Sequence, residues 1–334
     1  MKAESYSDVL LKPKYSTVPH REIDVDLTSD LAGLKLKLPV ISANMKNVTE
    51  TPMVDAMFHN GGLGILHRFC TIERNIEMFE ECCKLDIPVN RIGVSVGVKE
   101  EEKDRFQHLL MAGATLFCVD VAHGHHMNVN QMIQYMRAKS KNKNIRIIAG
   151  NVATPEAAFD LISWGADIIK VGIGPGLACV TRKNTGVGVP QLYAIKSIHE
   201  AHPNITLIAD GGIRTAGCIA KALAAGASAV MCGAVLAGTT ETPGRVFPNE
   251  DTDLVNRTYY KVYGGSASYA NKTNFIEGKI IKVPFKGQVK YILNEIKEGL
   301  ESCFSLCGSY NLKELQQKSE FISMDIGGKL ESET

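Results

Sequence analysis

The amino-acid sequence predicts an α/β protein, on the strength of two repeating patterns. Eight short runs of apolar and β-branched residues recur along the 334-residue chain, and segments with a helical spacing of apolar residues lie between them. The strand-like runs are apolar almost without interruption, which is typical of parallel strands covered on both faces. The runs are 39–43, 62–67, 92–97, 116–122, 145–152, 168–174, 206–212 and 229–234.

The number of repeats favours one architecture. Eight alternations of strand and helix fit a closed (β/α)8 barrel, the TIM barrel, better than an open doubly wound sheet, which usually has fewer parallel strands. Helical spacing is clearest in 49–60, 71–85 and 154–165. The stretches WGADIIKVG and AGASAVMCG each place a glycine where a helix must end in a left-handed cap. We therefore predict a single barrel domain over residues 1–334, with an N-terminal extension.

Two segments depart from the repeat. The stretch from Pro248 to Asn274 is polar and rich in Gly and Ser, and we expect a mobile loop over the barrel mouth, with a short active-site flap around 262–278. Roughly the last 16 residues carry few large apolar groups. We expect that tail to fray.

Composition excludes some classes of partner. The chain is 45% hydrophobic and 22% charged, and its 37 Lys and Arg nearly balance its 36 Asp and Glu. No large net field would attract nucleic acid or an anionic membrane. The first residues lack the apolar run of a signal peptide, and no stretch approaches the roughly 18 uninterrupted apolar residues of a membrane span. These features predict a cytoplasmic protein with small-molecule ligands.

The cysteines point to one unusual position. None of the nine is arranged in a metal-type C-x-x-C pair, and without a signal peptide we expect most to be reduced and several to fill core space. Cys179 differs because it follows the sixth strand in the glycine-rich stretch VGIGPGLACVTR. Catalytic residues of (β/α)8 barrels follow the carboxyl ends of strands, and glycines let backbone amides approach a ligand. Cys179 is therefore a candidate nucleophile, against the alternative of a space-filling side chain in a turn.

The ends of strands seven and eight predict an anion site. Strand seven ends in Asp210, Gly211 and Gly212, and strand eight is followed by Gly233 and Ala234. The loops after these two strands commonly bind phosphate in such barrels, and a nearby aspartate suits ribose hydroxyls. A plain turn is the alternative for the Asp-Gly-Gly stretch.

Strand four ends near Asp120, which is a candidate functional carboxylate or a structural hydrogen-bonding group. The nearby His123, His125 and His126 have no carboxylate or cysteine at supporting ligand spacing, so a solvated loop is favoured over a metal site.

Several stretches together resemble one known family. They are SDVLLKPKYSTV with DVDL, LPVISANMKNVTE, GIGPGLACVTRKNTGVGVPQL, ADGGIR, GAVLAGTTETPG and VPFKG, and they span the chain from Asp8 to about Phe321. They resemble the IMP dehydrogenase and GMP reductase family. The resemblance implies a barrel enzyme of purine nucleotide metabolism that forms a covalent thioimidate on a cysteine.

Two features resemble the GMP reductase branch of that family. Only residues 68–91 separate the second and third strands, which leaves no room for the regulatory domain that the dehydrogenases usually carry there. Between Ser266 and Glu277 the chain reads ASYANKTNFI, without the Arg-Tyr pair with which dehydrogenases activate water. The resemblance thus implies NADPH-dependent reduction of GMP to IMP and ammonia. An IMP dehydrogenase without the regulatory domain, or a catalytically weakened nucleotide-binding relative, are the alternatives.

The family's functional residues transfer to matching positions here. The resemblance implies Cys179 as nucleophile, a proton-transfer pair, a GMP site, an NADPH site, a K⁺ ion on backbone carbonyls and a homotetramer. The implied proton-transfer pair is Thr181 and Glu277; the implied GMP residues are Asp210, Gly211, Gly212, Gly233, Ala234, Gly264, Gly265, Ser266, Asn274 and Gly278; the implied NADPH residues are Arg21, Arg68, Asp120, Val121, Ala122, Ile173, Gly174 and Ser302; and the implied K⁺ carbonyls are those of Gly174, Gly176 and Cys179.

Three positions depart from the family pattern. Leu177 stands where the family usually has a phosphate-binding serine, Arg68 replaces a common lysine, and Gly265 replaces a common methionine. These departures bear on phosphate affinity, on cofactor preference and on the identity of the purine.

Overall fold

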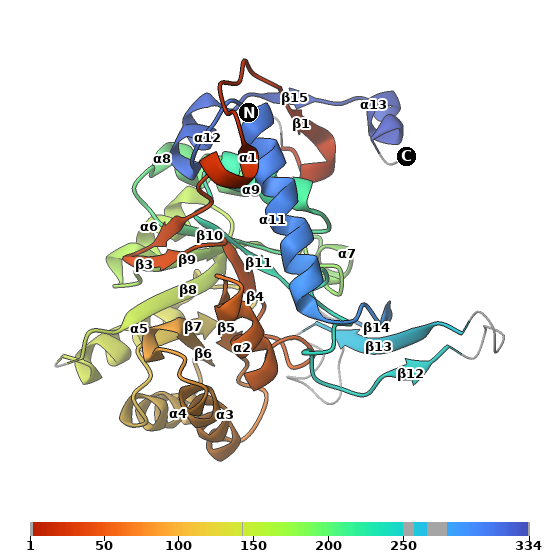
Figure 1. Ribbon diagram of the computed structural model, residues 1–334. Helices are drawn as coiled ribbons and strands as arrows, with labels where there is room; N and C mark the ends of the chain where they lie inside the picture. The colour runs from red at the N-terminus through yellow and green to blue at the C-terminus, as the bar shows by residue number, and fades with distance from the viewer. Residues whose placement is uncertain (1–2, 142, 250–256, 266–278, 333–334) are drawn as a thin grey trace.

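A closed barrel of eight parallel strands forms the centre of the computed structural model, which describes residues 3–141, 143–249, 257–265 and 279–332 (Figure 1). The strands follow one another around the barrel in chain order, and the last pairs with the first. The sequence-predicted fold is thereby confirmed. The barrel strands are β4 (Val40–Ser42), β5 (Leu63–Leu66), β6 (Ile92–Val96), β7 (Leu116–Asp120), β8 (Arg146–Val152), β9 (Ile168–Val171), β10 (Leu207–Asp210) and β11 (Ala229–Cys232).

Helices surround the barrel and connect its strands, as Figure 1 shows. Three of them confirm the helical segments predicted from apolar spacing, namely α2, α3 and α6. The connecting helices are α2 (Thr51–His59), α3 (Ile72–Lys84), η2 (Val89–Arg91), α4 (Glu100–Met111), α5 (Met127–Lys139), α6 (Pro155–Ser163), α7 (Thr181–Thr185), α8 (Gln191–Ala201) and α9 (Ala216–Ala224); the others are η1 (Tyr6–Asp8), α1 (Arg21–Asp24), α11 (Val289–Leu306), α12 (Leu312–Lys318) and α13 (Ile326–Glu331).

Local sequence signals fix where several helices begin and end. Thr71, Thr154 and Thr215 precede α3, α6 and α9, and each side chain accepts a hydrogen bond from a backbone N–H of the first turn. Gly165 and Gly226, which follow α6 and α9, have φ of +109° and +112°. Such positive φ values confirm the predicted glycine caps.

The core lies inside the barrel and between the barrel and its helices. Every residue of β4, β5, β6, β9 and β11 is buried, which explains why these strands read as continuous apolar runs. Phe117 of β7 packs edge-on against Phe106 of α4, with ring centroids 4.8 Å apart. Burying one such side chain contributes about 1.5–3 kcal/mol.

A hairpin covers the amino-terminal end of the barrel. It consists of β2 (Ser29–Leu31) and β3 (Leu34–Leu36). Ser29 donates to the carbonyl of Ser228, just before β11, and Arg146 at the start of β8 donates to the carbonyl of Ala32 at 2.7 Å. Because this end is closed, ligands have access from the carboxyl ends of the strands.

The prediction of a mobile loop over 248–274 is wrong for part of the residues that the structure describes. Tyr259–Gly264 forms β13, between β12 (Phe247–Pro248) and β14 (Ile280–Pro284) in an antiparallel sheet. Lys261 and Tyr263 are buried, and Tyr263 pairs with Ile281. Alternating burial of this kind indicates a strand, but the polar residues around it hid the pattern in the sequence. Residues 250–256 and 266–278 lie outside the described residues.

The expectation of a frayed tail is also wrong for most of it. Residues Phe321–Ser323 form β15, which pairs antiparallel with β1 (Val9–Leu11), and α13 follows. Asp325 caps α13 by accepting from the backbone N–H of Gly328 at 2.8 Å, and Lys329 pairs with Asp8. The tail is held by backbone pairing and ion pairs and needs few apolar side chains.

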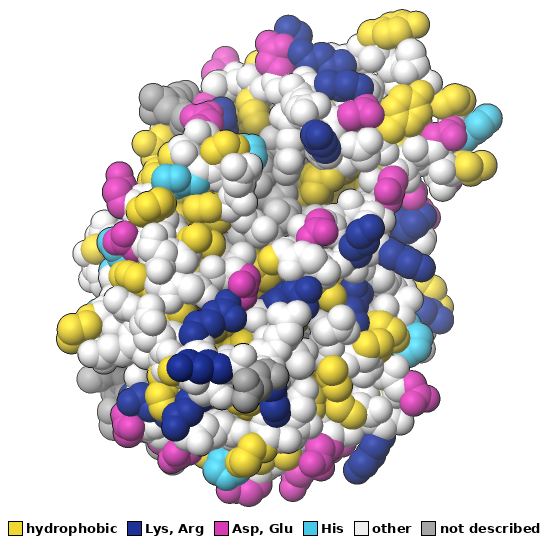
Figure 2. Space-filling view, turned by 90° about the vertical axis from the view of Figure 1, so that its left-hand side faces the viewer, with side chains coloured by type: hydrophobic (Ala, Val, Ile, Leu, Met, Phe, Trp, Pro, Cys, Tyr) yellow, Lys and Arg dark blue, Asp and Glu magenta, His cyan; other side chains and the backbone are white. Residues whose placement is uncertain are grey.

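Charges of both signs are mixed on the face seen in Figure 2, where Lys and Arg gather most densely in the lower half. No helix among the described residues is long and apolar enough to cross a membrane.

Candidate active site

Cys179 lies in the loop that follows β9, at the carboxyl end of the barrel. Its backbone N–H donates to the carbonyl of Gly176 at 3.0 Å, which closes a tight turn. Its half-buried thiol donates to the hydroxyl of Thr181 at 3.1 Å. The loop therefore presents a thiol and a hydroxyl as neighbours, which is the geometry that a nucleophile and a proton carrier need.

Arg182 fastens this loop to the barrel. Its guanidinium donates to the carbonyls of Ile173 and Val189. A Cβ added to Gly174 or to Gly188 would lie 2.5 Å or 2.6 Å from the Arg182 side chain, so both glycines are needed to let the arginine pass. Burial lowers the pKa of Arg182. The arginine is thus a structural part of the loop that carries Cys179.

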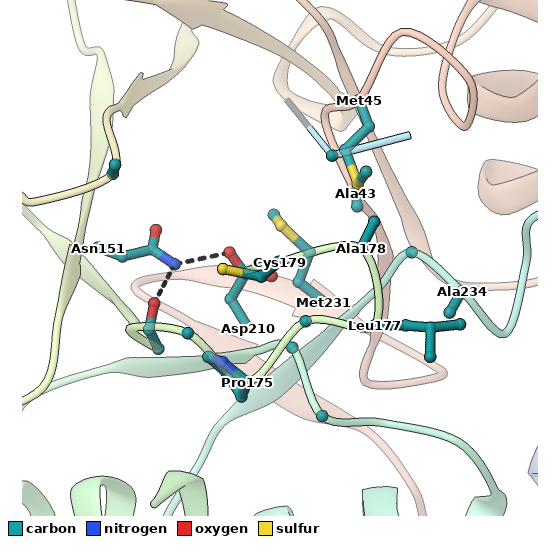
Figure 3. Close-up of a pocket in the computed structure, with 18 of the residues that line it drawn as sticks. Ala43, Met45, Asn151, Pro175, Leu177, Ala178, Cys179, Asp210, Met231 and Ala234 are labelled. Carbon is teal, nitrogen blue, oxygen red and sulfur yellow. Dashed lines mark hydrogen bonds between the residues drawn. The ribbon is translucent and has the colours of Figure 1, made fainter. Parts of the chain in front are cut away.

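A cavity of about 500 Å³ opens above Cys179. In Figure 3 the Cys179 side chain, the Asp210 carboxylate and Asn151 lie at the same part of this cavity, whereas Leu177 points toward Ala234 on the other side. Residues from six barrel loops meet there. The predicted residues that line the cavity are Arg68, Asp120, Val121, Ala122, Ile173, Gly174, Gly176, Cys179, Thr181, Asp210, Gly211, Gly212, Gly233, Ala234 and Gly265.

The floor of the cavity carries a cluster of charged and polar side chains. Lys170 of β9 donates to Asp120 Oδ1 at 3.0 Å, to Asp210 Oδ2 at 2.9 Å and to Asn151 Oδ1. Asn151 in turn donates to Asp210 Oδ2 at 2.9 Å and to the carbonyl of Gly172 at 2.7 Å. Four neighbouring strands, β7 to β10, therefore contribute one member each to a single network.

The pKa values of this cluster follow from burial and pairing. Burial disfavours the charged form of Lys170, but the attraction of Asp210 and Asp120 outweighs it and raises the pKa of the lysine. Burial likewise opposes ionisation of Asp120, yet the charges of Lys170 and Arg68 hold its pKa below the usual range. Asp120 and Lys170 are therefore an ion pair at neutral pH.

Some predicted residues are not brought to this cavity. Gly264 lies within β13 and does not line it. Arg21 and Ser302 contact each other, with Arg21 Nη1 donating to Ser302 Oγ at 3.1 Å, and neither lines the cavity within this chain. The remaining four predicted residues lie outside the described residues: Ser266, Asn274, Glu277 and Gly278.

The sequence disfavours a metal site at the histidine loop, and the family resemblance implies a K⁺ ion on the carbonyls of the glycine loop. His125 Nε2 lies 2.8 Å from Asp160 Oδ2, and the ring stacks on Trp164. No group of three or more His, Cys, Asp or Glu side chains suited to a metal occurs among the described residues. Of the carbonyls predicted to hold K⁺, that of Gly176 already accepts the Cys179 N–H and keeps one lone pair for a cation.

Sequence reasoning missed the floor of the cavity. Lys170, Asn151, Met45 and Tyr263 all line the cavity or contact its carboxylates. A lysine inside the apolar run IIKVGIG was a usable signal, because a strand buried on both faces holds a charge only when that charge is paired. Nothing in the local sequence indicated Met45.

The turn at Gly172 leads to a prediction about stability. Gly172 has φ of +150°, and a Cβ there would lie 2.0 Å from the carbonyl oxygen of Asp210. We expect Gly172→Ala to lower the free energy of unfolding by about 3 kcal/mol, through overpacking and backbone strain together. Urea denaturation measures the change. Gly186→Ala is the matched control, since its φ is +73° and nothing lies within 4 Å of its Cβ position. Its cost is about 1 kcal/mol, and equal losses in the two variants would contradict the steric argument.

Comparison with known proteins places this geometry in a family. The model of the IMP dehydrogenase / GMP reductase domain matches residues 3–334. GMP reductase of Acidovorax ebreus is 37% identical over 98% of this chain and 97% of its own length. Inosine-5'-monophosphate dehydrogenase of Cryptosporidium parvum is 34% identical over 99% of this chain and 94% of its own length.

A solved structure agrees with these matches. A cysteine-to-alanine variant of GMP reductase from Trypanosoma brucei, in complex with guanosine 5'-monophosphate, superposes with a TM-score of 0.89 at 27% identity. The superposition covers 99% of this chain and 97% of the other. The barrel, the glycine loop with its cysteine and these matches agree that the chain belongs to the IMP dehydrogenase and GMP reductase family of oxidoreductases.

Proposed function

We propose that this protein is a GMP reductase, which converts GMP and NADPH into IMP, ammonia and NADP⁺. The observation that carries the proposal is the Cys179 thiol, 3.1 Å from the Thr181 hydroxyl, beside a cavity with a carboxylate on its floor. The stretch ASYANKTNFI supports a reductase over a dehydrogenase, because it contains no arginine to activate water. Relatives with both activities occur at similar identity, so this local feature has the greater weight.

The proposed reaction runs in two halves at purine C2. The Cys179 sulfur bonds to C2, and the exocyclic amine leaves as ammonia after it has gained a proton. NADPH supplies a hydride to the same carbon when bound. The carbon–sulfur bond then breaks, IMP leaves, and the thiol regains its proton. An amine leaves readily only when protonated, so Thr181 with Glu277 is proposed to carry that proton, a contribution of typically ~10²–10⁴-fold.

The cavity offers a place for each part of GMP. Asp210 accepts from the ribose hydroxyls, as a carboxylate with several lone pairs can. Gly211, Gly212, Gly233 and Ala234 leave backbone close to the phosphate. The residues proposed to lie near the base are Gly264, Gly265, Ser266, Asn274 and Gly278, of which Gly265 lines the cavity.

An apolar side chain lines the part of the cavity proposed to hold the phosphate of GMP. Leu177 is 42% exposed and lines the cavity, so its apolar side chain stands where a hydroxyl donor would help bind phosphate. Arg214 lines the same cavity and offers a cation instead. We propose that phosphate affinity here depends on Arg214 and on backbone amides.

NADPH is proposed to enter beside the purine. Asp120, Val121, Ala122, Ile173 and Gly174 line that side of the cavity together with Arg68. Arg68 Nη2 donates to the carbonyl of Asp120 at 3.3 Å, which holds the cation at the rim. Five further expectations stay predictions. Two concern binding, namely the roles of Arg21 and Ser302 toward the cofactor and a K⁺ ion on the loop carbonyls. The others are a homotetramer, a cytoplasmic location and a single barrel domain without an inserted regulatory domain.

A nicotinamide absorbance assay tests the proposal. Purified protein mixed with GMP and NADPH should consume NADPH and release one ammonia per IMP, and NADH should be the poorer donor. IMP with NAD should yield at most trace XMP. No absorbance change with either pair would identify a nucleotide-binding relative without this activity.

A further inference from the structure

Lys170 occupies the centre of the cavity floor, between the proposed nucleotide side and the proposed nicotinamide side. Its side chain is 3% exposed, and its Nζ lies 3.0 Å from Asp120 Oδ1 and 2.9 Å from Asp210 Oδ2. Asn151 supplies a neutral oxygen to the same ammonium. All three N–H donors of the lysine are therefore used, and each has a partner on a different strand.

The two carboxylates share the ammonium of Lys170. Both lie within about 3 Å of Nζ, and their side chains are only 13% and 21% exposed, so water screens their mutual repulsion poorly. Arg68 adds a second positive charge on the Asp120 side, whereas Cys118 of β7 is buried and its thiol is neutral because burial raises its pKa to about 12. Two neighbouring carboxyl groups without a cation hold a shared proton.

We propose that Lys170 is a positioning residue that keeps Asp120 ionised and holds Asp210 in place on the same ammonium, and so couples the nucleotide half of the cavity to the nicotinamide half. The assignment of one ligand to each aspartate rests on the proposed function, but the electrostatic role does not. The three N–H donors of Lys170 are taken up by Asp120, Asp210 and Asn151, so its effect on either ligand would pass through these partners. A purely structural lysine would stabilise the barrel without affecting how Asp120 titrates.

Carbon-13 NMR of the aspartate carboxyl groups tests the electrostatic role without any ligand. In Lys170→Met, Asp120 should titrate about one pH unit or more above its wild-type midpoint, because its counter-charge is gone. Lys170→Gln replaces it if the methionine variant does not fold. An unchanged Asp120 midpoint in the variant would overturn the proposal.

Lys261→Met is the matched control. Lys261 is also 3% exposed, but its Nζ donates to the neutral carbonyls of Thr239 and Thr242 at 2.8 Å and 2.6 Å. Removing it deletes a buried lysine of the same size whose hydrogen bonds go to neither Asp120 nor Asp210. The Asp120 midpoint should therefore stay at its wild-type value in Lys261→Met, and an equal shift there would contradict the specific role of Lys170.

A double-mutant cycle tests the coupling to ligands. IMP is the probe, because it is the product of the reductase and the substrate of the dehydrogenase. Lys170→Met should weaken IMP binding by about 10- to 100-fold by calorimetry. In an Asp210→Asn background the same change should weaken it by less than about threefold, since the two residues act as a unit. Equal effects in both backgrounds would overturn the coupling.

Failure of the proposed function gives a different result. If the wild-type protein binds neither IMP nor GMP, the nucleotide assignment is wrong, and the carboxyl titration still decides whether Lys170 controls Asp120.

Discussion

Replacing Cys179 with alanine is expected to abolish turnover while GMP affinity stays within about tenfold of wild type. The thiol is proposed to form the covalent bond to purine C2, and no neighbouring side chain should replace a nucleophile fixed 3.1 Å from Thr181, its proposed proton partner. Affinity should be kept because Asp210 and the glycine loops, which line the cavity, are proposed to bind the rest of the nucleotide. The solved Trypanosoma brucei relative is a cysteine-to-alanine variant in complex with GMP. Steady-state assays and calorimetry measure the two quantities.

Two other cysteines serve as controls for this variant. Cys82 and Cys83 lie on α3, outside the cavity lining. Burial raises the pKa of Cys82 to about 12, so its thiol is not a nucleophile at neutral pH. Cys82→Ala and Cys83→Ala should both keep near wild-type turnover. If Cys179→Ala kept most of its activity, the covalent assignment would be wrong.

Glu277→Gln is expected to reduce GMP reduction by at least ~10²-fold while GMP and NADPH still bind. Glutamine keeps the shape of the side chain but cannot carry a proton, so the release of ammonia should slow most. Glu277 lies outside the described residues, and this prediction rests on the family resemblance. The nearest described residue, Lys279, donates its N–H to the carbonyl of Ala178, next to Cys179, at 2.9 Å.

Labelled NADPH distinguishes the two steps in that variant. Deuterium at the transferred position should produce little isotope effect in Glu277→Gln, because ammonia release limits the rate. Glu295→Gln, on the exposed face of α11, is the matched control and should behave as wild type. A strong isotope effect in Glu277→Gln would show that the residue serves hydride transfer, and its proposed role would fail.

The barrel could be predicted because its signals are local and repeated. Eight apolar runs, threonine caps and glycine caps such as Gly165 and Gly226 each reflect the chemistry of a few neighbouring residues. Cys179 and Asp210 could be found for the same reason, since the fold assigns catalytic residues to the carboxyl ends of strands.

The features that sequence reasoning missed depend on residues that are distant in the chain. In the sequence, Lys170 is a single polar residue in an apolar strand. Only the structure shows that Asp120 and Asp210 both accept hydrogen bonds from it. The pairing of β15 with β1, visible in Figure 1, joins residues at least 310 positions apart, from Leu11 with Phe321 to Val9 with Ser323. Backbone hydrogen bonds make this pairing, so it needs few apolar side chains. The strand β13 was missed because a Gly- and Ser-rich segment follows it and hides the alternation of buried and exposed residues.

The fate of the covalent intermediate tests the central claim most directly. The protein is given GMP with NADPH deuterated at the transferred position, and in parallel IMP with NAD in ¹⁸O-labelled water, and mass spectrometry follows the products. A GMP reductase should place deuterium at C2 of IMP, release one ammonia per IMP, and form at most trace XMP. Steady formation of ¹⁸O-labelled XMP faster than GMP reduction would contradict the account, because some residue would then be activating water.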